Sequence, residues 1–276
     1  MRFLVTGAQG LLGTQLVGAM RAAGVAVTAT GRRHAEDVFC CDLLNVSDVA
    51  RMIDKVVPDC IVHCAAHVPK ALGGYQDSDS ANASLRMLEA ILAGSDCPIV
   101  FVSSMTVYGA ERARPTVEQD AGDPISAYGK GKWQAEMRLK ADGRPTLVVR
   151  IPGLFGPARR DGLVFNVMNA LRHGHSPLQL PEAAILWTAM HVEDAAESIV
   201  NLALSPIVNF DAIHVGYRGA YSIDGFISLA ADICGRRVDY AVKHPSFEFD
   251  LTRAETRDAV PASSFRDALV KFGGQL

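Results

Sequence analysis

The chain has 276 residues, the size of one ordinary enzyme domain or of one core with a smaller lobe. Hydrophobic residues make up 49% of it and charged residues 21%, so the composition supports a buried core and excludes a disordered chain. The net charge of −3 gives no electrostatic reason to expect nucleic acid as a partner. The six cysteines are too sparse for a disulfide scaffold, so we expect free thiols.

The apolar runs of the chain have the length of strands, so we expect no membrane partner and no membrane-spanning segment. The first residues lead directly into a strand and a motif, so we expect no signal peptide. Together with free thiols, this predicts a cytoplasmic protein whose partner is a small-molecule substrate.

Short apolar runs alternate with helical patterns through the first half of the chain. Leu12, Leu16 and Met20 share one face of a helix predicted over 11–23, which ends at Gly24. Ser47 is predicted to cap a helix that runs to residue 56. Further predicted helices cover 83–93 and 127–141, and predicted strands cover 3–6, 25–30, 60–64, 99–102 and 146–150. This order predicts an α/β fold with a doubly wound parallel sheet.

The pattern loosens after Arg150, where Pro and Gly become frequent. Helices are predicted near 164–173, 192–204, 223–234 and 264–272, with a β-rich stretch from Val238 to Val242. We therefore predict a core over 1–150, to which later segments return. A smaller, mostly C-terminal lobe over 151–276 is predicted to cover the carboxyl edge of the sheet, where open α/β folds bind ligands.

Gly7, Gly10 and Gly13 follow the first predicted strand and open the first predicted helix. Glycines suit a tight turn and the close approach of backbone to a pyrophosphate. The pyrophosphate is expected on the amides around Leu11 and Leu12, at the positive end of the helix. The position directly after a strand favours a dinucleotide cofactor over an ordinary tight turn.

The end of the second predicted strand indicates which cofactor binds. The place of the acidic residue that holds the ribose of NAD falls on Gly31, and Arg32 and Arg33 follow it. Guanidinium groups suit a 2′-phosphate, so the sequence favours NADP(H) over the alternative cofactor NAD(H). The alternative interpretation of Arg32 and Arg33 is that they are solvated surface charges. Asp42, followed by Leu43, is a candidate either to accept from the adenine amino group or to cap the next helix.

Ser104, Tyr128 and Lys132 are the candidate catalytic residues. Ser104 follows the strand predicted over 99–102, while Tyr128 and Lys132 lie four residues apart and share one helix face. A nearby ammonium lowers the pKa of a tyrosine, which makes Tyr128 a candidate acid/base. Ser104 is expected to orient the substrate oxygen. An exposed helix face and a helix cap are the alternatives for these motifs.

In this order the motifs resemble those of the extended short-chain dehydrogenase/reductases of the NAD-dependent epimerase/dehydratase group. The resemblance rests on TGAQGLLG at 6–13, CDLLN at 41–45, HCAAH at 63–67, SSMTVYG at 103–109, YGKGK at 128–132, RIPGLFGP at 150–157 and HVEDAA at 191–196. It implies a Rossmann fold, a nicotinamide cofactor and a catalytic centre of Ser104, Tyr128 and Lys132. It also implies that Ala65 and Ala66 lie near the cofactor and that Ile151 passes its nicotinamide end.

The resemblance further implies hydride transfer on a secondary alcohol or ketone, with a sugar or nucleotide sugar as the expected substrate. It implies a homodimer formed through the helices near 83–93 and 127–141. One alternative is a net NADPH-dependent reductase of a non-sugar ketone or aldehyde. An alternative of another class is a non-catalytic NADP-binding regulator, which needs only the glycine turn.

Some positions depart from the pattern of the family or stay open. The asparagine that the family carries before the serine strand falls on Ser80 here, with Asn82 two residues later as a candidate replacement. Arg159 and Arg160 are candidates to bind a substrate diphosphate, with a solvated loop as the alternative.

A metal site is the least favoured interpretation of the histidines near the third strand. His63 and His67 lie four residues apart, but no acidic residue stands between them and the run is strand-like. We expect them to line a pocket or the core, and we predict no metal site.

Overall fold

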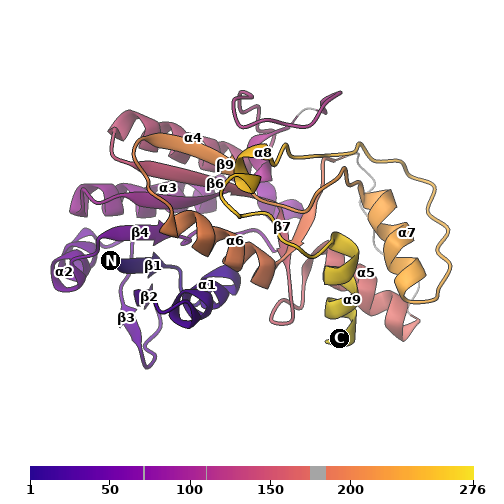
Figure 1. Cartoon of the computed structure of the whole chain (residues 1–276), viewed down its shortest axis with the longest axis horizontal. Coiled ribbons are helices and arrows are strands. Elements are labelled where there is room, and N and C mark those ends of the chain that lie inside the picture. Colours follow the sequence, from indigo (N-terminus) through magenta and orange to yellow (C-terminus); the bar gives the residue numbers. More distant parts are fainter. Residues whose placement is uncertain (71, 110, 175–184) are drawn as a thin grey trace.

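A computed structural model of the chain describes residues 1–70, 72–109, 111–174 and 185–276. Over these residues the main sheet has seven parallel strands in the order β3-β2-β1-β4-β5-β6-β9 (Figure 1). They are β1 (Arg2–Thr6), β2 (Ala26–Gly31), β3 (Val38–Cys40), β4 (Cys60–His63), β5 (Ile99–Ser104), β6 (Thr146–Ile151) and β9 (Phe210–His214). The strand order reverses between β1 and β4, which confirms the predicted doubly wound Rossmann fold.

Both faces of this sheet are covered by helices. Alternate residues of a strand point to opposite faces, so Phe3 and Val5 join one apolar cluster while Leu4 joins the other. Helices α1 (Leu11–Ala22) and α6 (Val192–Leu204) pack together on the first face. Helices α2 (Val46–Val56), α3 (Ser78–Gly94) and α4 (Ala127–Asp142) cover the second. Burial on both faces explains why the strands are continuous apolar runs.

The second half of the chain contributes both to this core and to a smaller lobe. Strand β9 pairs with β6, so the chain returns to the main sheet after residue 150. The lobe lies at the right in Figure 1 and is built on a short parallel pair, β7 (Gly153–Phe155) with β8 (Ala189–His191). Helices α5 (Gly162–His173), α7 (Ile223–Ile233) and α9 (Phe265–Gly274) surround this pair, and α8 (Thr252–Glu255) lies against β9.

Two local predictions are wrong. The cap of α2 is Asn45 rather than Ser47, because the Asn45 side chain accepts hydrogen bonds from the amides of Ser47 and Asp48. The stretch from Val238 to Val242 is not a strand, because strand-forming residues need a partner strand and this stretch has no ladder in the described chain.

The six cysteines are free thiols, as predicted. Among the described residues, no helix has the length and apolar character needed to cross a membrane.

Candidate active site

The residues predicted to form the site follow neighbouring strands at their carboxyl ends. The glycine turn with Gly7, Gly10, Leu11, Leu12 and Gly13 follows β1, Arg32 follows β2, Asp42 and Leu43 follow β3, Ala65 and Ala66 follow β4, and Ser104 and Ile151 end β5 and β6. Tyr128 and Lys132 come from the first turns of α4. Because the carboxyl ends of parallel strands meet at one edge, the fold gathers all of these residues at the edge where open α/β sheets bind ligands.

The glycines allow the turn at the start of α1 to pack closely against neighbouring backbone. Gly7 has a φ of 67°, and a Cβ there would lie 2.8 Å from the backbone of Ala65. A Cβ on Gly13 would collide with the Gly7 carbonyl. Gly10 caps α1 without a side-chain hydrogen bond, so no side chain of the cap occupies the positive end of this helix. These features fit the pyrophosphate of a dinucleotide.

Ser104 is buried at the last position of β5. Its Oγ accepts hydrogen bonds from the amide of Thr106 at 3.2 Å and from the Thr106 hydroxyl at 3.0 Å. The Ser104 hydroxyl is therefore positioned by its neighbour, while its own O–H is left to donate to a ligand oxygen.

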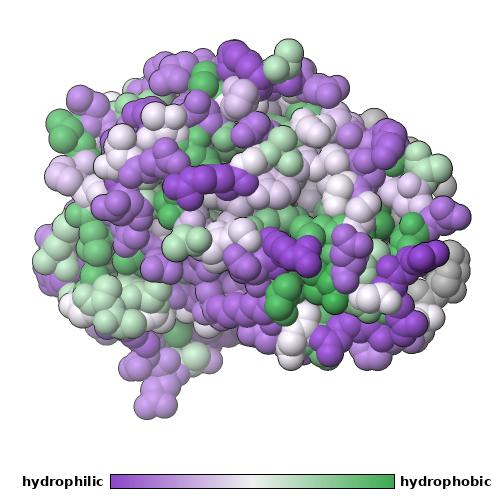
Figure 2. Space-filling model, turned by 45° about the vertical axis from the view of Figure 1, so that its right-hand side comes forward, coloured by the Kyte–Doolittle hydropathy of each residue, from purple (hydrophilic) through white to green (hydrophobic). Residues whose placement is uncertain are grey.

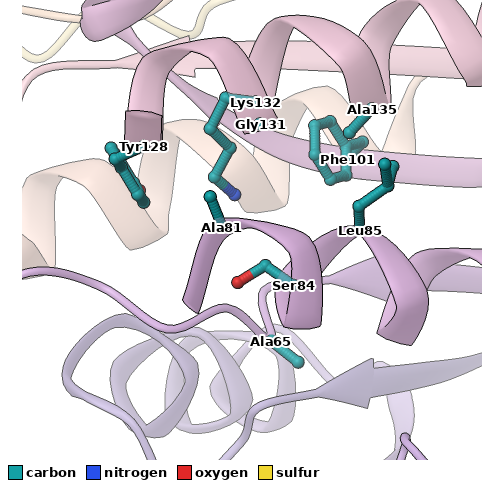
Figure 3. Close-up of a pocket in the computed structure, with 9 residues that line it drawn as sticks. All are labelled: Ala65, Ala81, Ser84, Leu85, Phe101, Tyr128, Gly131, Lys132 and Ala135. Atoms are coloured by element: carbon teal, nitrogen blue, oxygen red, sulfur yellow. The ribbon is translucent and has the colours of Figure 1, made fainter. Parts of the chain in front are cut away.

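Lys132 is buried between α4 and β5. Its Nζ donates to the Val102 carbonyl at 2.7 Å and lies 4.7 Å from the centroid of the Phe101 ring. Burial lowers the pKa of Lys132 to about 8, with the charges of Cys64 and Glu136 opposing this shift. The close-up in Figure 3 shows Lys132 and Tyr128 extending from α4 toward α3.

The environment of Tyr128 differs from the prediction. The ring of Tyr75 packs edge-on against it, with centroids 5.7 Å apart. Burial raises the pKa of Tyr128 above its ordinary value, Tyr75 raises it further, and Arg159 opposes the shift. The expected lowering by Lys132 is wrong for this structure, because that ammonium is engaged by the Val102 carbonyl and lies 5.9 Å from the Tyr128 ring centroid.

Helix α3 offers Ser84 to the site rather than Asn82. Asn82 is exposed, whereas Ser84 lines the same small cavity as Tyr128 and Lys132 (Figure 3). The Ser84 hydroxyl donates to the Ser80 carbonyl and accepts from the amide of His67, both at 2.9 Å. Sequence reasoning missed Ser84, although its place one helical turn after Ser80 was a usable signal.

The residues at the predicted adenosine end are mostly at the surface. Arg32 and Arg33 are exposed, and neither guanidinium has a hydrogen bond or ion pair within the described residues. The β2–β3 connection that carries them projects at the bottom of Figures 1 and 2, where hydrophilic side chains cover it. Asp42 accepts from the amide of Leu44 at 3.1 Å, and Leu43 is buried in the core under α2. Asp42 is therefore not the cap of α2.

A buried polar network behind Ser104 was also missed by sequence reasoning. Arg150 donates to both carboxylate oxygens of Glu136, with Nη2 2.6 Å from Oε2, and Ser103 donates to the same carboxylate. Arg150 also donates to the hydroxyl of Tyr108, which is hydrogen-bonded to His214 at 2.8 Å. The network joins β5, α4, β6 and β9 directly behind the candidate catalytic residues.

The two candidate arginines of the lobe already have partners. Arg159 donates to Asp161 at 2.6 Å and to the Leu154 carbonyl at 3.0 Å, and the Arg160 guanidinium lies 5.7 Å from the ring centroid of Phe165. Both side chains are therefore engaged within the lobe, and a diphosphate contact would have to compete with these interactions.

The histidine that ends β4 belongs to the core. His63 is buried, and its Nδ1 is hydrogen-bonded to the Thr6 hydroxyl at 3.0 Å. The described chain contains no group of three His, Cys, Asp or Glu side chains placed to hold a metal ion.

The comparisons with known proteins agree with this arrangement. A family model described as the RmlD substrate binding domain matches residues 1–255. The chain belongs to this family. UDP-glucose 4-epimerase of Azospirillum brasilense is 28% identical over 275 residues, which covers 86% of this chain and 78% of that protein. The dTDP-4-keto-6-deoxy-D-glucose reductase of Streptomyces niveus is 32% identical over 173 residues, which covers 59% of this chain and 55% of that protein.

Solved structures share the whole fold of this RmlD-family chain. The UDP-glucose 4-epimerase of Thermus thermophilus, in a complex with NAD, superposes with a TM-score of 0.81 at 19% identity and covers 100% of this chain and 98% of that one. The predicted membership of the extended short-chain dehydrogenase/reductases is confirmed. The chain is an NAD(P)-dependent oxidoreductase or epimerase. A homodimer through α3 and α4, which pack side by side in Figure 1, stays a prediction.

Proposed function

We propose that this RmlD-family enzyme transfers hydride between NADP(H) and a secondary alcohol or ketone carbon of a sugar or nucleotide sugar. The observation that carries the proposal is the position of Ser104, Tyr128 and Lys132 at the same sheet edge as the glycine turn. A nicotinamide cofactor bound along this edge supplies or accepts the hydride. The sugar substrate is supported by the epimerase and the keto-sugar reductase among the relatives.

Each catalytic side chain has a role in this proposal that follows from its surroundings. The Ser104 hydroxyl donates to the substrate oxygen and orients it. Tyr128 gives its phenolic proton to that oxygen as the carbon gains a hydride, and takes a proton back in the reverse direction. Burial raises the pKa of Tyr128, so the phenol carries its proton at neutral pH but is a weaker acid than a free tyrosine. Lys132 is the candidate to hold the ribose beside the nicotinamide.

The preference for NADP(H) is supported by the end of β2. No carboxylate stands at Gly31, and Arg32 and Arg33 carry positive charges with no ion pair within the described residues. Guanidinium groups bind phosphate through paired hydrogen bonds, so this end of the site suits a ribose 2′-phosphate. NAD(H) is the alternative cofactor.

An epimerase or dehydratase that returns the hydride to its substrate is the second candidate, favoured by the epimerase that aligns with 86% of the chain. The two candidates differ in the fate of the cofactor. To distinguish them, the protein is purified without added nucleotide and denatured, and any nucleotide that it releases is identified. Stoichiometric NAD(H) or NADP(H) supports the epimerase or dehydratase, since a recycled cofactor need not leave. An empty protein that binds NADPH better than NADH supports the net reductase.

The variant Tyr128→Phe tests the proposed catalysis. It keeps the ring that packs against Tyr75 but removes the proton, so we expect turnover of the ketone substrate to fall about 10²–10⁴-fold while NADPH affinity changes little. The control Tyr221→Phe removes a phenol that donates to the Arg218 carbonyl in the lobe, and we expect it to keep near-normal turnover. Full activity of Tyr128→Phe would contradict the role of Tyr128 as the proton donor. Binding of NADPH without turnover of any ketone by the natural chain would instead support a non-catalytic NADP-binding regulator.

A further inference from the structure

The glycine turn contains one polar side chain that reaches across to the second strand. Gln9 lies between Gly7 and Gly10, and its Nε2 donates to the Arg33 carbonyl at 2.8 Å. The amide of Arg33 donates back to the Gln9 Oε1 at 3.0 Å. One carboxamide thus satisfies both backbone groups of Arg33 and ties the β1–α1 turn to the connection after β2.

The Gln9 side chain also fills the space above Gly31. A Cβ at Gly31 would lie 2.6 Å from Gln9 Cδ and 2.8 Å from Gln9 Cγ, closer than real Cβ contacts. A side chain at position 31 therefore requires the Gln9 side chain, which makes both hydrogen bonds to Arg33, to shift. Position 31 is where an acidic residue would hold the ribose hydroxyls of NAD. The Gln9 side chain and a carboxylate side chain at position 31 would compete for the same space.

The same backbone segment is held from its other side. The Cys40 thiol donates to the Arg32 carbonyl at 3.4 Å, and the amide of Cys41 donates to the Gly31 carbonyl at 2.9 Å. The backbone from Gly31 to Arg33 is therefore fixed by hydrogen bonds, while both arginine side chains are exposed. An arginine residue whose backbone is already ordered loses less conformational freedom when its side chain binds an anion.

We propose that Gln9 is a specificity-determining positioning residue for the adenosine end of the cofactor. It holds the Arg32–Arg33 backbone in place and occupies the space that a side chain at position 31 would need, so that guanidinium groups rather than a carboxylate meet the ribose 2′ position. Gln9 acts through the arginines and does not itself bind the phosphate. This inference rests on the proposed preference for NADP(H).

The variant Gln9→Ala tests this role by its effect on cofactor preference. Dissociation constants of NADPH and NADH are measured by fluorescence titration of the whole protein. We expect Gln9→Ala to lower the preference for NADPH about tenfold, mainly by weakening NADPH, because the fixed geometry of the arginines is lost. Gln134→Ala, on the exposed side of α4, is the matched control and should leave the preference unchanged.

The variant Gly31→Asp tests the exclusion between the two positions, with thermal unfolding as a check that each variant folds. In the presence of Gln9 we expect Gly31→Asp to weaken both cofactors, because the new side chain collides with the carboxamide. In the double variant with Gln9→Ala, we expect the affinity for NADH to be at least tenfold higher than in Gly31→Asp alone. An equal NADH affinity of Gly31→Asp with and without Gln9 would overturn the inference.

The outcomes separate this inference from the proposal on which it rests. Binding of neither dinucleotide by the natural chain overturns the proposed function, and the role of Gln9 with it. Equal affinity for NADPH and NADH, with equal losses in Arg32→Ala, overturns the NADP(H) preference. A clear NADPH preference that Arg32→Ala abolishes and Gln9→Ala leaves intact overturns the role of Gln9 alone.

Discussion

Neutralising Glu136 tests the buried network behind Ser104. The side chains of Glu136 and Arg150 are 0% and 3% exposed, and Arg150 donates to both carboxylate oxygens. In Glu136→Gln the volume is kept, but the guanidinium of Arg150 stays buried without its counter-ion. Removing one partner of a buried ion pair costs about 3–5 kcal/mol, so we expect a loss of this size in the free energy of unfolding.

This loss is measurable by urea denaturation and by thermal unfolding. An unfolding entropy of about 2.1 cal/mol/K per residue gives roughly 0.6 kcal/mol per degree for a chain of this length, so Tm should fall by about 5–9 °C. Lys271→Met provides the control. It removes the Lys271–Glu193 pair, whose side chains are 51% and 40% exposed, and should cost no more than about 1 kcal/mol.

Equal losses in Glu136→Gln and Lys271→Met would refute the reasoning, because burial would then have no bearing on the pair. The double variant Glu136→Leu with Arg150→Met removes both charges together. We expect it to lose less stability than Glu136→Gln, since no uncompensated charge is left inside the protein.

Two further predictions concern pH and the glycine turn. Burial lowers the pKa of both His63 and His214 to about 3, so the unfolded chain takes up these protons below pH 6.5 while the folded chain does not. The free energy of unfolding should therefore fall as pH drops from 6.5 toward 3, by about 2 kcal/mol per histidine at pH 5. Denaturation curves at pH 7 and pH 5 measure this, and a flat profile would contradict it. In the turn, Gly13→Ala places a methyl group against the Gly7 carbonyl and should weaken dinucleotide binding and lower Tm. Gly18→Ala in the same helix meets open space and should raise stability by up to about 1 kcal/mol, so equal effects of the two variants would count against the steric argument.

Much of the fold could be predicted from local patterns. The strands of the first half are continuous apolar runs because both faces of the sheet are covered, and the helices between them carry an apolar stripe. The glycine turn could be predicted from its glycines, because positions 7 and 13 have no room for a side chain. The shared face of Tyr128 and Lys132 follows from the helical repeat alone.

Only the tertiary structure decided which side chains of distant segments contact one another. The contact of Gln9 with Arg33, the burial of Glu136 against Arg150, and the place of Ser84 beside Lys132 depend on how elements pack, which spacing along the chain does not encode. The pKa of Tyr128 was mispredicted for the same reason, since the sequence gives the distance to Lys132 along the helix but not the carbonyl that engages its ammonium. The sequence thus determined which residues reach the edge of the sheet, and packing determined which partners their charges and hydrogen bonds have. The reason is that burial and hydrogen-bond geometry arise only once distant strands and helices meet.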